Sequence, residues 1–161
     1  MTQKPIKRDE NIRHFSKEHH FSLLFCWKIR QGIKKDVDRE RIRRYVKYFW
    51  VKCLQPHFQT EEELLFVPSG SRMVQRALNE HKLIGELVAV ILKPAARDVS
   101  KKLSLLADAI NDHVRFEERQ LFPHLEKKLG RTKLQSIGEH MPEEIPADEY
   151  RDDFWNWPST L

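Results

Sequence analysis

Apolar residues recur at intervals of three and four along most of the 161-residue chain. This is the period of an α-helix that buries one face. Four such segments cover residues 10–31, 38–66, 71–92 and 99–129. No stretch shows the strict apolar–polar alternation of a half-buried strand. Four long amphipathic helices with short connections predict an all-α protein, an antiparallel up-down-up-down four-helix bundle.

Glycine and proline positions suggest where these helices end or bend. Gly32 and Gly130 follow the first and fourth apolar stripes, so each is expected to stop its helix. Pro56 lies inside the second stripe and is expected to kink it. The segment "VPSGSR" at 67–72 reads as a loop, and "TKLQSI" at 132–137 as one short extra turn.

Charge divides the chain into a basic bundle and an acidic C-terminal tail. Residues 139–161 hold seven acidic residues and one basic residue, a net charge of −6, and since the whole chain carries +5, residues 1–138 carry +11. We therefore predict a bundle over 1–138 and an acidic, tryptophan-containing tail over 139–161 that packs on or near it. The basic stretch between Lys28 and Lys47 lacks the glycine and aromatic pattern of nucleic-acid modules. It is expected to be a solvated corner partly neutralised by the tail, with no nucleic-acid partner.

Few features point to a membrane or to an oxidising compartment. The amino-terminal "MTQKPIKRDENIR" has no apolar core of a signal peptide. The longest apolar run, "LVAVIL" at 87–92, is too short to span a bilayer. The two cysteines, Cys26 and Cys53, do not form a disulfide framework. These patterns predict a cytoplasmic protein with no membrane partner.

Histidine and glutamate interrupt the apolar stripes of all four helices, where a core residue is expected. Buried carboxylates cost several kcal/mol unless they are paired or coordinated. Two carboxylates facing one bundle interior would also repel each other, and a cation between them removes that penalty. The residues on the stripes are His19, His57, Glu61, His81, His113 and Glu117.

The spacing of these residues strengthens the case for metal. His57 and Glu61 are four residues apart, as are His113 and Glu117, so each pair lies on one helix face. Carboxylates from two facing helices can bridge two metal ions, and histidines from the other helices can complete the coordination. Imidazole and carboxylate without thiolate suit iron or manganese, with zinc as a further alternative.

At these residues the sequence resembles a hemerythrin-like protein of the HHE cation-binding type. The resemblance covers residues 10–129 and rests on "KEHH", "HFQTEEELLF", "NEHKL" and "HVRFEERQLFP", one on each helix. It implies a four-helix bundle around two non-heme iron ions with an oxo, hydroxo or water bridge. It further implies ligation by His57, Glu61, His81, His113 and Glu117, with Glu61 and Glu117 as bridging carboxylates.

Two positions qualify this resemblance. Oxygen-carrying hemerythrins have a second histidine four residues after the histidine of helix three, where this chain has Gly85. The centre therefore has one imidazole fewer than an oxygen carrier, which moves the chain toward sensors and stress-response proteins. On helix one, the apolar stripe favours His19 as the ligand, but His20 shares a stripe with Leu24 and Trp27 and stays a candidate.

Three functions follow as hypotheses. The first is a di-iron protein that binds or senses oxygen, nitric oxide, peroxide or iron itself and uses an unidentified redox partner. The second is an enzyme that reduces nitric oxide or peroxide, or donates iron for cluster repair. It ranks lower because no acid–base residue beyond the ligands is recognisable. The third is a helical interaction module in which the metal is only structural.

Overall fold

The computed structural model describes residues 7–66 and 71–157 of the chain. Within these ranges all regular structure is helical. The helices are α1 (Arg13–Lys34), α2 (Arg39–Phe49), η1 (Trp50–Leu54), α3 (Gln55–Thr60), η2 (Glu61–Phe66), α4 (Arg72–Ile91), α5 (Val99–Phe116), η3 (Glu117–Leu121), α6 (Phe122–Glu139) and η4 (Phe154–Asn156). The predicted all-α class is therefore confirmed. Most of the loop predicted at 67–72 lies outside the described residues.

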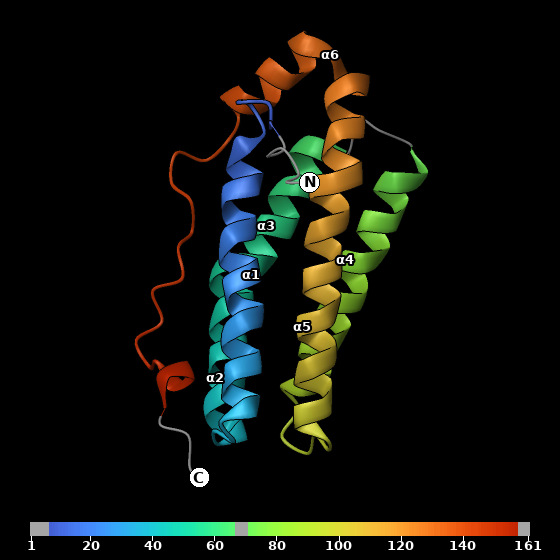
Figure 1. The fold of residues 1–161 in the computed structure, drawn as a ribbon. Helices are drawn as coiled ribbons and strands as arrows, with labels where there is room; N and C mark the ends of the chain where they lie inside the picture. The colour runs from blue at the N-terminus through green and yellow to red at the C-terminus, as the bar shows by residue number, and fades with distance from the viewer. Residues whose placement is uncertain (1–6, 67–70, 158–161) are drawn as a thin grey trace, which may run out of the picture.

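The long helices lie side by side as a bundle (Figure 1). In that view the chain descends through α1, returns through α2 and α3, descends through α4 and rises through α5. Helix α5 packs against both α1 and α4. None of the described helices is long and apolar enough to cross a membrane.

The second and fourth helical runs each contain π-helical turns. η1 interrupts the run from Arg39 to Phe66, η2 forms its last segment, and η3 joins α5 to α6. Pro56 stands in the first turn of α3, directly after η1. Such π-helical turns are uncommon and occur frequently at functional sites.

Of the two glycines expected to end helices, Gly130 breaks the helical path and Gly32 does not. Gly130 has φ 75° and ψ 166°, so it breaks the helical path, but helical structure resumes and continues to Glu139. Gly32 lies inside α1, which ends at Lys34. A Cβ at Gly32 would stand 2.8 Å from Cε2 of Phe154, so this glycine makes room for the tail. The prediction that Gly32 stops the first helix was wrong.

The tail lies along α1 and α2 (Figure 1). Its Asp148 carboxylate lies 3.0 Å from Nζ of Lys28 and also accepts a hydrogen bond from Tyr45. Arg41 pairs with Asp152, and Phe154 is fully buried. These contacts bring acidic tail residues onto basic residues of the 28–47 region.

Two apolar clusters form the interior, and a polar layer separates them. One cluster contains Phe25, Ile29, Ile84, Leu106 and Ile110, together with neighbours from α2. The other is built around residues at the opposite end of the same helices, namely Ile12, Phe15, Leu65, Val74, Phe116 and Leu121. Along their helices, His19, Glu61 and His81 fall between residues of the two clusters. The fold thus surrounds a polar centre with apolar packing on both sides.

Candidate metal centre

Glu61 and Glu117 hold equivalent places in the two helical runs that contain π-helical turns. Each is the first residue of such a segment, η2 for Glu61 and η3 for Glu117, and each is 0% exposed. Their partners His57 and His113 precede them by four residues and are also buried. Two helices therefore bring an imidazole and a carboxylate to the same level of the bundle interior.

One group of four donors gathers around His81 and His113. Together with Glu61 and Glu117, they can place one ligand atom each within 4.8 Å of all the others. The Nε2 atoms of His81 and His113 are 3.1 Å apart. Two nitrogens bound to one metal at about 2.0–2.1 Å would be separated by roughly 2.8 to 3.4 Å, depending on the bond angle. The observed separation fits a shared ion.

A second group of three donors shares Glu61 with the first. Its other members are His19 and His57. Nε2 of His57 lies 3.0 Å from Oε1 of Glu61, and Nε2 of His19 lies 3.9 Å from Oε2. His20 is exposed and lies outside both groups, because the one-residue step on α1 turns it away from the interior. On helix one the structure thus places His19, and not His20, in a buried donor group.

The carboxylate oxygens in this centre lack hydrogen-bond partners among the described residues. Both oxygens of Glu61 and both oxygens of Glu117 are buried without such a bond, and so is Nε2 of His19. Buried polar groups in folded proteins are nearly always satisfied. A cation between the carboxylates would satisfy these atoms together, so the residues present fit a metal.

The buried carboxylates of the centre raise the pKa values of the histidines beside them. Burial disfavours the charged form of His57, yet the Glu61 and Glu18 carboxylates outweigh it and raise the pKa of His57 to about 10. The pKa values of His81 and His113 are raised too, despite burial, by Glu117 and neighbouring carboxylates. Glu117 is deeply buried, but the histidines hold its pKa well below its usual range. A metal ion would replace these protons.

Carboxylates outside the centre face the second nitrogen of each imidazole. Nδ1 of His19 lies 2.7 Å from Glu118, and Nδ1 of His113 lies 2.8 Å from Glu80. Glu18 and Glu62 approach Nδ1 of His57 and His81 less closely, at 3.5 and 3.8 Å. None of these four glutamates was predicted from the sequence to be a ligand. Their only sequence signal is an acidic residue on a helix flank beside a predicted ligand.

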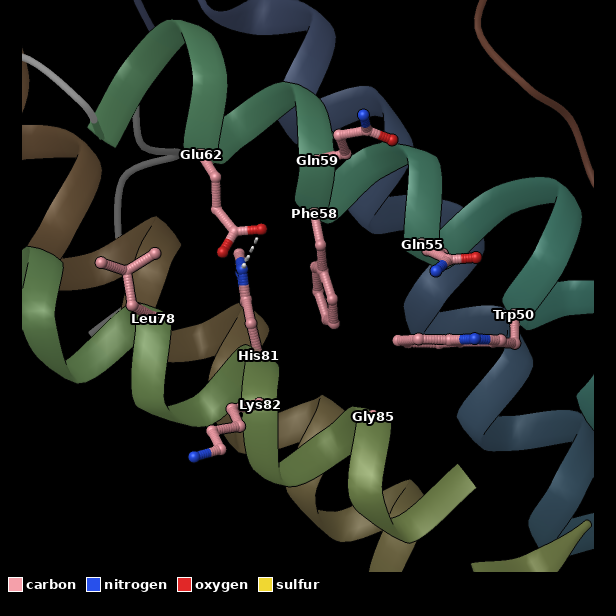
Figure 2. A pocket seen from close by; sticks show the side chains of 9 residues that line it. All are labelled: Trp50, Gln55, Phe58, Gln59, Glu62, Leu78, His81, Lys82 and Gly85. Atoms are coloured by element: carbon pink, nitrogen blue, oxygen red, sulfur yellow. Dashed lines mark ion pairs between the residues drawn. The ribbon is translucent and has the colours of Figure 1, made fainter. Parts of the chain in front are cut away.

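Gly85 lines a pocket of about 390 Å³ that reaches His81 (Figure 2). A Cβ at Gly85 would make ordinary contact with the Trp50 ring, at 3.4 Å, but a full imidazole would meet that ring. Phe58 stacks on His81 with ring centroids 3.8 Å apart, and its ring also lines the pocket. Trp50 and Phe58 therefore occupy the side of the centre from which a further histidine would approach.

Both cysteines are buried, and their thiols are poor nucleophiles. Burial raises the pKa of Cys26 and of Cys53 to about 12. Neither cysteine belongs to a donor group among residues 7–66 and 71–157. Nitrogen and oxygen donors make up the candidate centre.

The sequence profile of the family described as "Hemerythrin HHE cation binding domain" matches residues 11–125. That range includes both donor groups and most of the bundle. The chain belongs to the hemerythrin HHE cation-binding domain family. The predicted family resemblance is thereby confirmed, and the buried histidine and glutamate cluster agrees with the cation binding in the family's description.

One curated relative of this HHE-domain chain is a "DNA nickase" from Nostoc sp. (strain PCC 7120). The two sequences are 29% identical over 138 residues, which cover 81% of this chain and 38% of the relative. The HHE-domain chain thus spans less than half the length of that protein. No solved structure shows significant similarity to the HHE-domain chain.

Proposed function

We propose that this HHE-domain chain is a non-heme di-iron protein that binds or senses a small oxidant, such as oxygen, nitric oxide or peroxide, or iron itself. The observation that carries the proposal is the pair of buried donor groups that share Glu61. We take the surrounding helices to be an antiparallel up-down-up-down bundle. Each ion would receive two imidazoles, and the carboxylates of Glu61 and Glu117 would lie between the ions.

Iron is the metal that best suits both the donors and the proposed ligand. Imidazole with carboxylate suits iron, manganese or zinc, whereas the buried thiols of Cys26 and Cys53 offer no soft ligand. Bound ferrous ions would supply the electrons that a small oxidant requires. Glu61 and Glu117, both unexposed, would hold the ions together while their charge changes.

The protein itself contributes orientation and exclusion of water. Phe15 and Phe122 lie against His57 and His19, and Phe58 covers His81, so the imidazoles are fixed by aromatic packing. The pocket at Gly85, Trp50 and Phe58 supports entry of a small ligand on the His81 side. Gly85 brings no imidazole to this side of the centre, which leaves the pocket available to a small ligand.

Ligand binding by the iron-loaded protein tests this function. The ferrous protein, prepared without oxygen, would be exposed in separate samples to air, nitric oxide and azide while its visible absorption is recorded. We expect a saturable spectral change with at least one of these ligands. A protein that holds two irons but shows no change with any of them would refute oxidant binding and leave the metal a structural role. Steady-state turnover with a reductant would distinguish an enzyme from a binding protein.

A second candidate function is metal-dependent cleavage of one DNA strand. The relative named as a DNA nickase favours it, as does the charge of +11 on residues 1–138, because a cationic surface attracts phosphates. It runs against our sequence-based prediction of no nucleic-acid partner. Conversion of supercoiled to relaxed plasmid by the metal-loaded chain, abolished in Glu61→Gln, would support nicking. No relaxation by the wild-type chain would reject it.

A further inference from the structure

Two of the four imidazoles in the centre are held by a carboxylate that is itself held by an arginine. Nδ1 of His19 lies 2.7 Å from Oε1 of Glu118, and Nη2 of Arg8 lies 2.9 Å from Oε2 of the same carboxylate. Arg8 also donates to the backbone carbonyl of Glu118 and to Glu126. The result is a continuous chain of polar contacts from Arg8 to a candidate ligand.

A similar chain of polar contacts leads to His113 in the other donor group. Nδ1 of His113 lies 2.8 Å from Oε1 of Glu80, and Nε of Arg76 lies 2.9 Å from Oε2 of Glu80. The two arginines also have similar surroundings, because each packs over a phenylalanine ring. Arg8 is 5.2 Å from the centroid of Phe122, and Arg76 is 3.9 Å from that of Phe116.

The two chains serve different ions if the centre binds two. His19 belongs to the group completed by His57 and Glu61, whereas His113 belongs to the group of His81, Glu61 and Glu117. The other two imidazoles have looser outer partners, with His57 at 3.5 Å from Glu18 and His81 at 3.8 Å from Glu62. Each group thus contains one tightly held and one loosely held imidazole.

A carboxylate at Nδ1 has a defined effect on a ligating histidine. It accepts a hydrogen bond from Nδ1–H, which fixes the tautomer, turns Nε2 toward the metal and makes that nitrogen a stronger donor. The arginine orients the carboxylate and keeps it ionised. Glu118 illustrates this balance, because burial opposes its ionisation, yet His19, Ser16 and Arg8 lower its pKa to about 2.

We infer that Arg8–Glu118–His19 and Arg76–Glu80–His113 are two positioning chains, each of which tunes the binding of one metal ion in the centre. This inference rests on the proposed di-metal function. Glu118 and Glu80 are positioning residues, since each acts through its histidine and not on the metal directly. The two arginines should differ in their effect on metal binding, because the side chain of Arg8 is 5% exposed and that of Arg76 is 54% exposed. An exposed ion pair contributes little, so Arg8 has the larger effect.

The test is metal titration of the full chain with Co²⁺ alone, whose visible absorption reports bound ions. The variants are Glu118→Gln, Glu80→Gln and the double variant, with Glu63→Gln as the matched control. Glu63 is an exposed glutamate in η2 whose side chain accepts a hydrogen bond from Gln59. Loss of an outer carboxylate typically weakens metal binding by about 10- to 100-fold.

We expect each single variant to keep one tight ion and to bind the other about 10- to 100-fold more weakly. The double variant should bind both ions weakly, and Glu63→Gln should match the wild type. In iron-loaded protein, each single variant should also raise the reduction midpoint potential, because a negative charge next to the centre is lost. Wild-type affinity for both ions in the single variants would overturn the inference, as would equal weakening of both ions in one single variant or an equal loss in Glu63→Gln.

Arginine variants keep the inference testable if a glutamate variant fails to fold. Arg8→Ala and Arg76→Ala break the chains farther from the centre, and Arg30→Ala removes an ion pair with Asp108 that touches no histidine. We expect Arg8→Ala to weaken one ion by less than Glu118→Gln but more than Arg76→Ala weakens the other. Affinities equal to those of Arg30→Ala in both variants would overturn the inference. Failure of the wild-type chain to bind two Co²⁺ ions would instead refute the proposed function.

Discussion

Replacement of Glu61 by glutamine should remove the metal-dependent part of the protein's stability. Glu61 is the only residue shared by the two donor groups found among residues 7–66 and 71–157. Its carboxylate lies 3.0 Å from Nε2 of His57 and 3.4 Å from Nε2 of His81. A glutamine keeps the size of the side chain but loses the negative charge that a cation requires, so both ions should be affected.

The magnitude follows from binding linkage. A ligand present at 100 times its Kd stabilises the folded state by about 2.7 kcal/mol, so two ions would contribute about 5 kcal/mol. For a domain of this size, about 1 kcal/mol moves Tm by roughly 2 to 4 °C, which gives a metal-dependent increase of about 10 to 20 °C. If Glu61→Gln weakens each ion a hundredfold, only about 0.4 kcal/mol per ion is left, and the increase falls to about 2 to 3 °C.

The assay compares thermal unfolding of each protein with and without Fe²⁺ under anaerobic conditions. The difference between the two curves removes any effect of the substitution on the metal-free fold. Glu63→Gln is the control, since it makes the same charge change two residues later on an exposed side chain. An Fe²⁺-dependent increase in Glu61→Gln as large as in the wild type would refute the central role of Glu61.

Three further predictions concern the helix-one ligand, pH and the tail. His19→Ala should lower the iron content from about two to about one per chain while His20→Ala keeps two, and equal losses in elemental analysis would contradict the choice of His19. In the metal-free protein the pKa of His57 is raised from 6.5 to about 10. The free energy of unfolding measured in urea should therefore fall by a few kcal/mol as the pH rises from 6.5 through 10. A value independent of pH over this window would refute the ionic pairing. Phe154→Ala should destabilise the protein by about 3 kcal/mol, since it empties a fully buried site. Gly32→Ala should lower the free energy of unfolding less in the Phe154→Ala background than in the wild type. Additive effects in a double-mutant cycle would show that Gly32 and Phe154 do not contact each other.

Helical periodicity in the sequence predicted which histidines and glutamates meet in the buried donor groups. His57 with Glu61 and His113 with Glu117 are local pairs, and the apolar stripe placed His19 inside without knowledge of its neighbours. The choice between His19 and His20 depended on how the rest of α1 packs, since both residues had apolar companions. Only the assembled bundle, in which His20 is exposed, separated them.

Features that depend on distant contacts could not be predicted in the same way. Arg8 donates a hydrogen bond to Glu118, which is 110 residues away in the sequence. The local sequence around either residue does not indicate this contact. Gly32 looked like a helix end because glycine often ends helices, but its role is to admit Phe154, which lies far along the chain. The π-helical turns at Glu61 and Glu117 also escaped prediction, because their apolar spacing differs little from that of an α-helix.

Elemental analysis of the purified chain tests the central claim most directly. The account predicts about two iron ions per chain in the wild type after loading with Fe²⁺ and removal of excess metal. It also predicts far fewer than two in Glu61→Gln, with no change in Glu63→Gln. A wild-type chain that is folded, as judged by circular dichroism, but retains no iron, manganese or zinc would contradict the account.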